Sequence, residues 1–278
     1  TYKIRLRIDG KLVDVSTIEK DSGEQIVRAF EVGSHIDSST SRHSLDGRMT
    51  VRARGEDYEL RVAAAPGLLG HKITVRVLTN QVMQFDLASI GLTKDEEVVR
   101  EALESGNGLI LVSGPTGSGK TTTAYALLGH LLQKGVNLVT LEDPVEYQLD
   151  GATQIEVDAD TGFTFAEGIR SLLRHDPDAL FLGEIRDAET AANAVDASFS
   201  GHTVISTIHA RHCVSAVTML RSMGVTNHML APALRLIINQ RLVRRLCDQC
   251  KDTRNTTTRE ADWFKSASLA APDQVSTP

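Results

Sequence analysis

The chain has 278 residues, of which 41% are hydrophobic, and its formal net charge is −6. This hydrophobic fraction is enough to form a core, and the modest charge excludes a disordered acidic chain and a generic nucleic-acid binder. The sequence has no run of about 18 apolar residues and no charged-then-apolar leader, so we expect a soluble protein without a secretory signal. Three cysteines are too few for a disulfide framework and favour a reducing cytosol.

The first part of the chain alternates apolar and polar side chains, which is the period of β-strands. The alternation is clearest at Tyr2, Ile4, Leu6 and Ile8, where we expect a half-buried strand that ends in a hairpin at Asp9-Gly10. Similar runs occur at 49–53, 60–62 and 73–77, with a short helix at 25–30. We therefore predict a small α+β domain over residues 1–80.

The rest of the chain follows a different pattern. Residues 81–91 have no clear period and are interpreted as a linker, and Thr93 with Glu96 forms a capping box that begins a helix. Short apolar runs then alternate with helical segments, which predicts a mainly parallel sheet covered on both faces. The expected strands are 109–112, 137–141, 179–182 and 203–208, with a helix over 121–132. We predict an α/β domain over 92–245 and a C-terminal tail over 246–278.

One motif carries the strongest functional signal, because G-x-x-x-x-G-K-[ST] lies between a predicted strand and a predicted helix. Glycines let backbone N–H groups approach an anion without a Cβ in the way, and the helix N-terminus favours a phosphate. Lys120 is placed to neutralise β/γ-phosphate oxygens, and the Thr121 hydroxyl to ligate Mg²⁺. The alternative is a glycine-rich turn that precedes a lysine by chance. We predict ATP and Mg²⁺ as cofactors, with the phosphates held by Gly114, Pro115, Thr116, Gly117, Ser118, Gly119, Lys120, Thr121 and Thr122.

Hydrolysis also needs a carboxylate that holds Mg²⁺ or positions the attacking water. Glu142 and Glu184 each follow an apolar strand, at the carboxyl ends where open α/β sheets bind ligands. The alternative for each is a solvated loop. His202 and His209 flank the strand 203–208, and we interpret them either as structural residues or as sensors of the γ-phosphate.

Five segments together resemble the secretion and type IV pilus assembly ATPase family, the type II secretion E-protein group. GPTGSGKTTT resembles its Walker A, TLEDPVEY its Asp box, LLRHDPDALFLGEIRD its atypical Walker B and GHTVISTIHA its His box. NQRLVRRLCDQC resembles the segment that leads into the zinc module of the export and extension branch. RLRIDGKLVDV and LDGRMTVRARGEDYELRVAAAPGLLGHKITVRVL resemble the second N-terminal domain of the family.

The resemblance implies a RecA-like P-loop ATPase domain behind a PAS-like domain, assembled as a homo-hexamer with ATP between the two domains of one subunit. It implies Glu142 as the water-activating or metal-side carboxylate and Glu184 as the Walker B carboxylate. It makes His202 and His209 sensors.

The arginines of the N-terminal part have two interpretations. By alternation alone, six of them are solvent-facing strand residues: Arg5, Arg7, Arg52, Arg54, Arg61 and Arg76. The resemblance singles out Arg61 and Arg76 as the pair that reaches the ATP phosphates, a role that suits a guanidinium. Arg48, Arg52 and Arg54 stay face residues or subunit contacts.

The implied function is an ATP-hydrolysing motor that powers pseudopilus or type IV pilus assembly and protein secretion across the bacterial envelope. Such a protein is cytoplasmic, and inner-membrane platform proteins hold it at the inner face of the cytoplasmic membrane. The alternatives are a conjugation or DNA-uptake motor, a retraction motor and a non-hydrolysing nucleotide-dependent scaffold. The CDQC segment favours the export and extension branch over retraction, and no basic stripe predicts stable nucleic-acid binding.

Two features depart from the family pattern. Cys247-x-x-Cys250 is half of a zinc site, which needs four ligands, and no Cys or His follows it, so we expect no stable zinc. Cys213 is expected to be a buried small apolar residue. We also expect the chain to be a fragment that lacks the upstream N-terminal domain and the end of the zinc module.

Overall fold

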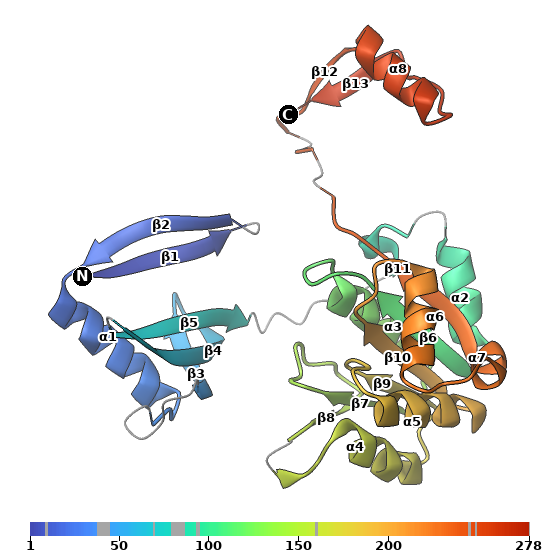
Figure 1. The fold of residues 1–278 in the computed structure, drawn as a ribbon, viewed down its shortest axis with the longest axis horizontal. Helices are drawn as coiled ribbons and strands as arrows, with labels where there is room; N and C mark the ends of the chain where they lie inside the picture. Colours follow the sequence, from blue (N-terminus) through green and yellow to red (C-terminus); the bar gives the residue numbers. More distant parts are fainter. Residues whose placement is uncertain are drawn as a thin grey trace. The chain divides into compact units, whose positions relative to one another are not determined.

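The structure is a computed structural model that describes the chain except residues 9–10, 38–44, 69, 79–86, 93–94, 159–160, 244–245, 248 and 278. The chain forms two compact units, Thr1–Ser89 with Ala126–Gly183 and Ile90–Tyr125 with Glu184–Pro278. Helices and strands carry the labels of Figure 1. Among the described helices, none combines the length and apolar character that a bilayer span requires.

The N-terminal residues form antiparallel strands and one helix, as the alternating pattern predicts. The elements are β1 (Tyr2–Ile8), β2 (Lys11–Ile18), α1 (Lys20–Gly33), β3 (Leu45–Ala53), β4 (Glu56–Gly67) and β5 (Gly70–Leu78). Strands β3, β4 and β5 make a three-stranded sheet in that order, and α1 lies beside it (Figure 1). Every second residue of β4 faces the helix side, so Leu60, Val62 and Ala64 form a core with Ile36.

The first strand departs from the expected burial. We expected a half-buried strand, but Ile4, Leu6 and Ile8 are 39%, 51% and 54% exposed. The physical reason is that β1, among the described strands, pairs with β2 alone, as a separate two-stranded sheet. An alternating pattern predicts a strand with an apolar face, but it does not supply an element to cover that face.

A six-stranded sheet forms the α/β part, with the order β11-β6-β10-β9-β7-β8. Its strands are β6 (Gly108–Ser113), β7 (Leu138–Glu142), β8 (Thr153–Glu156), β9 (Ala179–Leu182), β10 (Thr203–Ile208) and β11 (Leu234–Asn239). Strand β6 pairs in parallel with β10 and β11, and β7 pairs in parallel with β8 and β9. Every residue of β6, β7, β9 and β10 is buried, as expected for parallel strands covered on both faces. These four strands confirm the prediction, whereas β8 and β11 were not predicted.

Helices connect the strands. They are α2 (Glu96–Glu104), α3 (Lys120–Gln133), α4 (Phe165–Leu172), α5 (Ala188–Phe199), α6 (Cys213–Ser222) and α7 (Asn227–Ala233), with 3-10 turns η1 (Leu87–Ile90) and η3 (Leu173–His175). Helix α3 agrees with the prediction to within one residue at each end. Helix α2 begins at Glu96 with Asp95 as its N-cap, while Thr93 lies outside the described residues.

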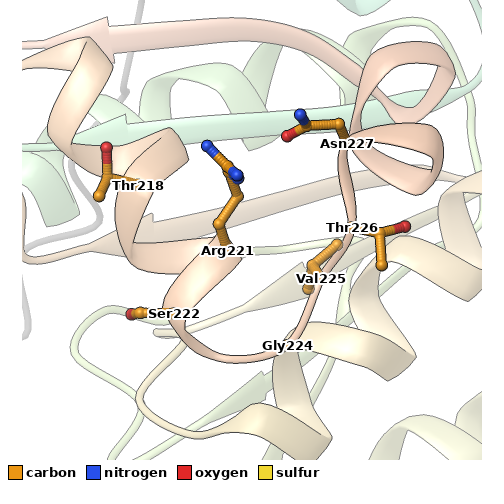
Figure 2. Close-up of a pocket in the computed structure, with 7 residues that line it drawn as sticks. All are labelled: Thr218, Arg221, Ser222, Gly224, Val225, Thr226 and Asn227. Carbon is orange, nitrogen blue, oxygen red and sulfur yellow. The ribbon is translucent and has the colours of Figure 1, made fainter.

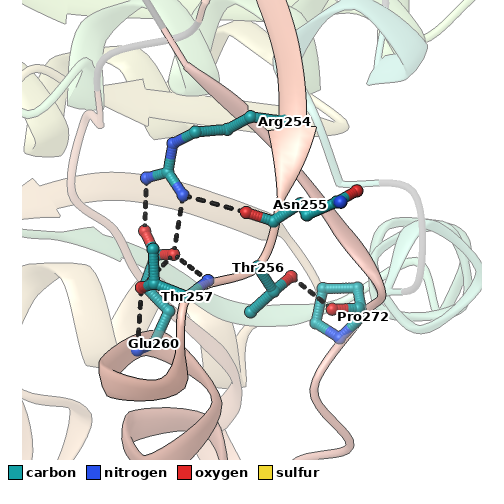
Figure 3. Close-up of polar contacts among 6 residues, drawn as sticks. All are labelled: Arg254, Asn255, Thr256, Thr257, Glu260 and Pro272. Carbon is teal, nitrogen blue, oxygen red and sulfur yellow. Dashed lines mark hydrogen bonds and ion pairs between the residues drawn. The ribbon is translucent and has the colours of Figure 1, made fainter.

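The tail forms a small element of its own, with β12 (Asp252–Asn255), α8 (Thr258–Ser266) and β13 (Gln274–Thr277). Strands β12 and β13 pair antiparallel. Thr257 and Glu260 make a capping box at the start of α8. The Arg254 guanidinium donates to both carboxylate oxygens of Glu260, at 2.9 and 2.7 Å (Figure 3).

Candidate nucleotide-binding site

The glycine-rich loop lies where the sequence places it, between the end of β6 and the start of α3. Gly117 and Gly119 have φ of 75° and 83°, in the left-handed region that favours glycine. A Cβ on Gly114 would lie 2.4 Å from Ser118 Oγ and 2.7 Å from the Gln240 carbonyl oxygen. The loop therefore has no room for a side chain at residue 114, whereas a Cβ on Gly117 would meet nothing within 4 Å, so the backbone at residue 117 is open to close approach by an anion.

Lys120 is the central cation of the loop. It is 9% exposed, and its Nζ donates to the carbonyl oxygens of Gly114 and Pro115 at 3.1 and 3.2 Å. Burial lowers the pKa of Lys120, and the negative charge of Glu184 opposes that shift. An ammonium group has three protons, so one remains for a phosphate oxygen.

The hydroxyl groups of the loop complete the donor set. Ser118 Oγ is buried and has no hydrogen-bond partner in the described part of the chain. Thr121 and Thr122 are half-buried in the first turn of α3, where backbone N–H groups lack helical partners. Backbone N–H groups, one ammonium and hydroxyl oxygens are the donors and ligands that a triphosphate with Mg²⁺ needs, so the residues fit ATP and Mg²⁺.

Glu184 follows β9 and belongs to the same compact unit as the loop. Its side chain is 15% exposed and forms an ion pair with the Arg186 guanidinium. His209 Nε2 lies 3.7 Å from the second carboxylate oxygen of Glu184. The backbone N–H of Ile185 donates to the Thr207 carbonyl at 3.0 Å, which ties this segment to β10. The carboxylate is thus held between two groups that can carry positive charge.

The two histidines lie at opposite ends of β10. The parallel register pairs Ile208 with Ser113, so His209 follows at the edge of the sheet where the phosphate loop begins. The register pairs Thr203 with Gly108, so His202 lies at the other edge, roughly 20 Å away for a strand of this length. There His202 Nδ1 lies 3.0 Å from the Ala197 carbonyl oxygen. The structure therefore does not bring His202 to the loop, against the expectation of a paired sensor.

Glu142 belongs to the other compact unit. It is the last residue of β7 and is 2% exposed. Thr140 Oγ1 donates to Glu142 Oε1 at 2.6 Å, and Gln154 Nε2 donates to the same oxygen at 3.2 Å. A buried carboxylate with two side-chain donors has a fixed orientation, which a group that positions water or a hydrated metal needs.

Arg61 and Arg76 are direct cross-strand partners in β4 and β5. Arg48 of β3 is the partner of Arg61 on the other side, so three arginines form one row across the sheet. The row lies on the face opposite Leu60 and Val62. Like charges in direct opposition destabilise a sheet, so this arrangement favours an anion-binding role. Arg48 also lies 3.8 Å from Glu59 and 3.0 Å from Glu156.

Two residues that sequence reasoning missed contact the phosphate loop region. Gln240 Nε2 donates to the Ser118 carbonyl at 2.7 Å, and Asn239 Nδ2 donates to Ser113 Oγ at 2.8 Å. The sequence carries two signals, a pair of amide side chains after the apolar run that forms β11 and the position of this pair at the start of NQRLVRRLCDQC. Without that strand in the prediction, the pair could not be assigned to the site.

The cysteines are all exposed and free. The prediction that Cys213 is buried is wrong, because Cys213 is the exposed first residue of α6, where its Sγ lies 3.7 Å from the Ile237 carbonyl oxygen. The backbone N–H groups of Gln249 and Cys250 lower the pKa of the Cys247 thiol. In the described chain, no group of three or more His, Cys, Asp or Glu residues is arranged to hold a metal ion. The absence of stable zinc stays a prediction.

A separate pocket of about 470 Å³ lies between α6 and α7 (Figure 2). Its lining includes the side chains of Thr218, Arg221 and Asn227. The predicted site residues do not line it, so the phosphate loop and this pocket are distinct features.

Comparison with known proteins matches residues 1–275 to the family model described as type II/IV secretion system protein. A putative type II secretion system protein E of Escherichia coli (strain K12) is 41% identical over 97% of this chain and 55% of its own length. The type II secretion system ATPase E of Vibrio cholerae is 39% identical over 96% of this chain and 53% of its own length. The chain thus spans about half the length of these relatives.

Among solved structures, the pilus retraction motor PilT with bound ADP is similar, with a TM-score of 0.66 and 28% identity over 86% of this chain and 71% of that chain. The ATPase DotB of Legionella pneumophila has a TM-score of 0.71 at 24% identity, over 87% of this chain and 72% of that chain. These matches confirm the predicted fold class, a RecA-like P-loop domain.

Proposed function

Because the chain belongs to the family of type II/IV secretion system proteins, we propose that it is the ATP-hydrolysing part of a motor for pseudopilus assembly and protein secretion. The observation that carries the proposal is the phosphate loop, in which buried Lys120 lies beside glycines that leave no side chain between the backbone and an anion. The names of the relatives support the secretion role, and the ADP bound to PilT supports an adenine nucleotide as the ligand.

The proposed chemistry assigns a task to each side chain. The loop N–H groups and Lys120 bind the β/γ-phosphates, and Thr121 and Thr122 provide hydroxyl groups in the first turn of α3. Mg²⁺, when bound, neutralises charge on the phosphate oxygens. Glu184 orients the attacking water or the hydrated metal, with His209 beside it. Glu142, fixed by Thr140 and Gln154, is the second carboxylate for water activation.

The remaining proposals concern the whole protein. We place a small domain at 1–80, a linker at 81–91, the ATPase domain at 92–245 and the tail at 246–278. Arg61 and Arg76 contribute charge stabilisation to the phosphates. The working form is a homo-hexamer that inner-membrane platform proteins hold at the inner face of the cytoplasmic membrane.

Replacement of Glu184 by glutamine tests the enzymatic part. Glu184→Gln is expected to keep ATP binding and to slow phosphate release roughly 100-fold or more, because the neutral amide neither holds a hydrated metal as a carboxylate does nor accepts a proton from the attacking water. Glu101→Gln, an exposed position on α2, is the control and is expected to keep the parental rate. Parental turnover in Glu184→Gln would refute its role. ATP binding without turnover by the parent, even as an oligomer of the full-length protein, would favour the nucleotide-dependent scaffold.

A further inference from the structure

The end of β11 carries three consecutive polar residues, Asn239, Gln240 and Arg241, whose side chains all bond to backbone or side-chain groups of neighbouring loops. The backbone N–H of Gln240 donates to the Ser113 carbonyl at 3.0 Å, which continues the β6–β11 ladder by one residue. The position of these side chains is therefore fixed by the sheet.

Gln240 acts on one particular peptide of the phosphate loop. Its Nε2 donates to the Ser118 carbonyl oxygen at 2.7 Å. In a trans peptide the carbonyl and the next N–H lie in one plane and point in opposite directions. A donor that holds the Ser118 carbonyl outward therefore aims the Gly119 N–H inward, toward the side where a phosphate binds.

Gln240 packs closely against two glycines of the loop, Gly114 and Gly119. A Cβ on Gly114 would lie 2.7 Å from the Gln240 carbonyl oxygen, and a Cβ on Gly119 would lie 3.2 Å from its Nε2. Gln240 thus packs against both ends of the loop, and its amide restricts the movement of the peptide that it binds.

Asn239 and Arg241 bind the segment that follows His209. Asn239 Nδ2 donates to the Ala210 carbonyl at 3.2 Å, and Arg241 Nη2 donates to the Arg211 carbonyl at 2.6 Å. Arg241 Nη1 also donates to Asn239 Oδ1 at 3.1 Å, which links the two side chains. The same strand end therefore holds both the phosphate loop and the backbone beside the Glu184–His209 pair.

We propose that Gln240 is a positioning residue for nucleotide binding, because it orients the Ser118–Gly119 peptide. Asn239 and Arg241 hold the backbone that follows His209 in a fixed position relative to that peptide. The inference rests on the proposed function, since it assumes that the loop binds the phosphates of an adenine nucleotide.

Gln240→Met tests it, because methionine keeps the length of the side chain and removes the donor. The dissociation constant for a fluorescent ADP analogue with Mg²⁺ is expected to rise about 2- to 10-fold, the range for loss of one neutral hydrogen bond. The amide resonance of Gly119 is expected to shift in the nucleotide-free protein, with little change in Tm. Arg235→Met is the matched control, because Arg235 lies at the other end of β11 and, within the described part of the chain, its side chain bonds to Asn107.

A second variant covers the case in which methionine disturbs packing. Gln240→Asn keeps the amide but is one methylene shorter, so it is expected to weaken ADP binding as well. Parental affinity in both variants, with an unshifted Gly119 amide, would overturn the inference and leave the proposed function intact. If the parent itself fails to bind the ADP analogue, both the inference and the proposed function are overturned.

Discussion

Lys120 and Glu184 influence each other electrostatically across the candidate site. Burial disfavours the charged ammonium of Lys120, while the negative charge of Glu184 favours it. Glu184 is also paired with Arg186 and lies near His209. A change at Glu184 is therefore expected to alter the titration of Lys120 as well as the position of water.

This coupling gives a prediction with a definite sign. Glu184→Gln removes the attraction that stabilises the Lys120 ammonium, so the pKa of Lys120 is expected to fall further below its usual value of 10.5. More of the neutral amine is then present at a given alkaline pH. The pH at which half of Lys120 is acylated by an amine-reactive reagent, measured by peptide mass spectrometry, should be lower in Glu184→Gln than in Glu101→Gln. An unchanged profile, or a shift to higher pH, would contradict the predicted coupling.

The predictable residues of the site belong either to one continuous motif or to the end of an apolar strand. The loop from Gly114 to Thr121 is one continuous motif, and Glu184 and His209 each follow a strand that hydrophobicity identifies. Gln240 could not be predicted, because it lies 122 residues from Ser118 along the chain and only the sheet brings them together. His202 and His209 were expected at opposite ends of the strand 203–208, and the parallel β6–β10 register shows that His202 lies at the end away from the loop.

At the scale of elements, buried strands were predictable and their less regular neighbours were not. Strands β6, β7, β9 and β10 are short apolar runs with helices between them. This pattern is typical of a parallel sheet with helices on both faces. Strand β11 begins at Leu234 directly after α7 ends at Ala233, with no turn residue to mark the boundary. Strand β8 is a polar segment at the edge of the sheet, where periodicity gives no signal.

The tail element offers a test of local electrostatics. The hydrogen bonds from Arg254, and then those from Thr257, hold the pKa of Glu260 well below its usual range. Because the folded pKa is depressed, the contribution of Glu260 to α8 is present above its unfolded pKa of about 4.3 and is lost only as the pH falls through the lower folded value. Helix α8 is therefore expected to stay capped at a pH where an ordinary glutamate is half protonated.

Carboxyl carbon NMR titration measures this directly. Arg254→Ala is expected to raise the midpoint of Glu260 toward the ordinary value, because it removes the largest cause of the shift. Arg259→Ala is the control, since Arg259 has no hydrogen bond or ion pair within the described residues and should leave the midpoint in place. Equal midpoints in the parent and Arg254→Ala would show that the ion pair in Figure 3 does not persist in solution.

At the scale of the whole molecule, the chain spans about half the length of the type II secretion relatives that it matches. The proposed function assigns anion binding to two regions, the phosphate loop and the row of Arg48, Arg61 and Arg76 on the N-terminal sheet. Turnover is expected to need both, because charge on the transferring phosphoryl group calls for cations beyond a single lysine.

Arg76→Ala tests the contribution of the N-terminal sheet. It is expected to lower the rate of phosphate release about 10-fold or more, while the dissociation constant for ADP changes less, because an arginine that acts on the transition state affects turnover more than ground-state binding. Arg52→Ala is the control on the same sheet, where Arg52 lies 3.8 Å from Asp57. A loss of activity that is equal in the two variants would assign the effect to general charge on the sheet.

Hydrolysis of ATP at the loop that contains Lys120 is the proposed activity on which every other proposed role depends. The most direct measurement is steady-state phosphate release from Mg²⁺-ATP over a series of protein concentrations, for the parent and for Lys120→Ala. We expect release by the parent, with a rate per subunit that rises as oligomers form, and background release by Lys120→Ala. Release at the same rate in both proteins, or no release by the parent at any concentration, would contradict the proposed function.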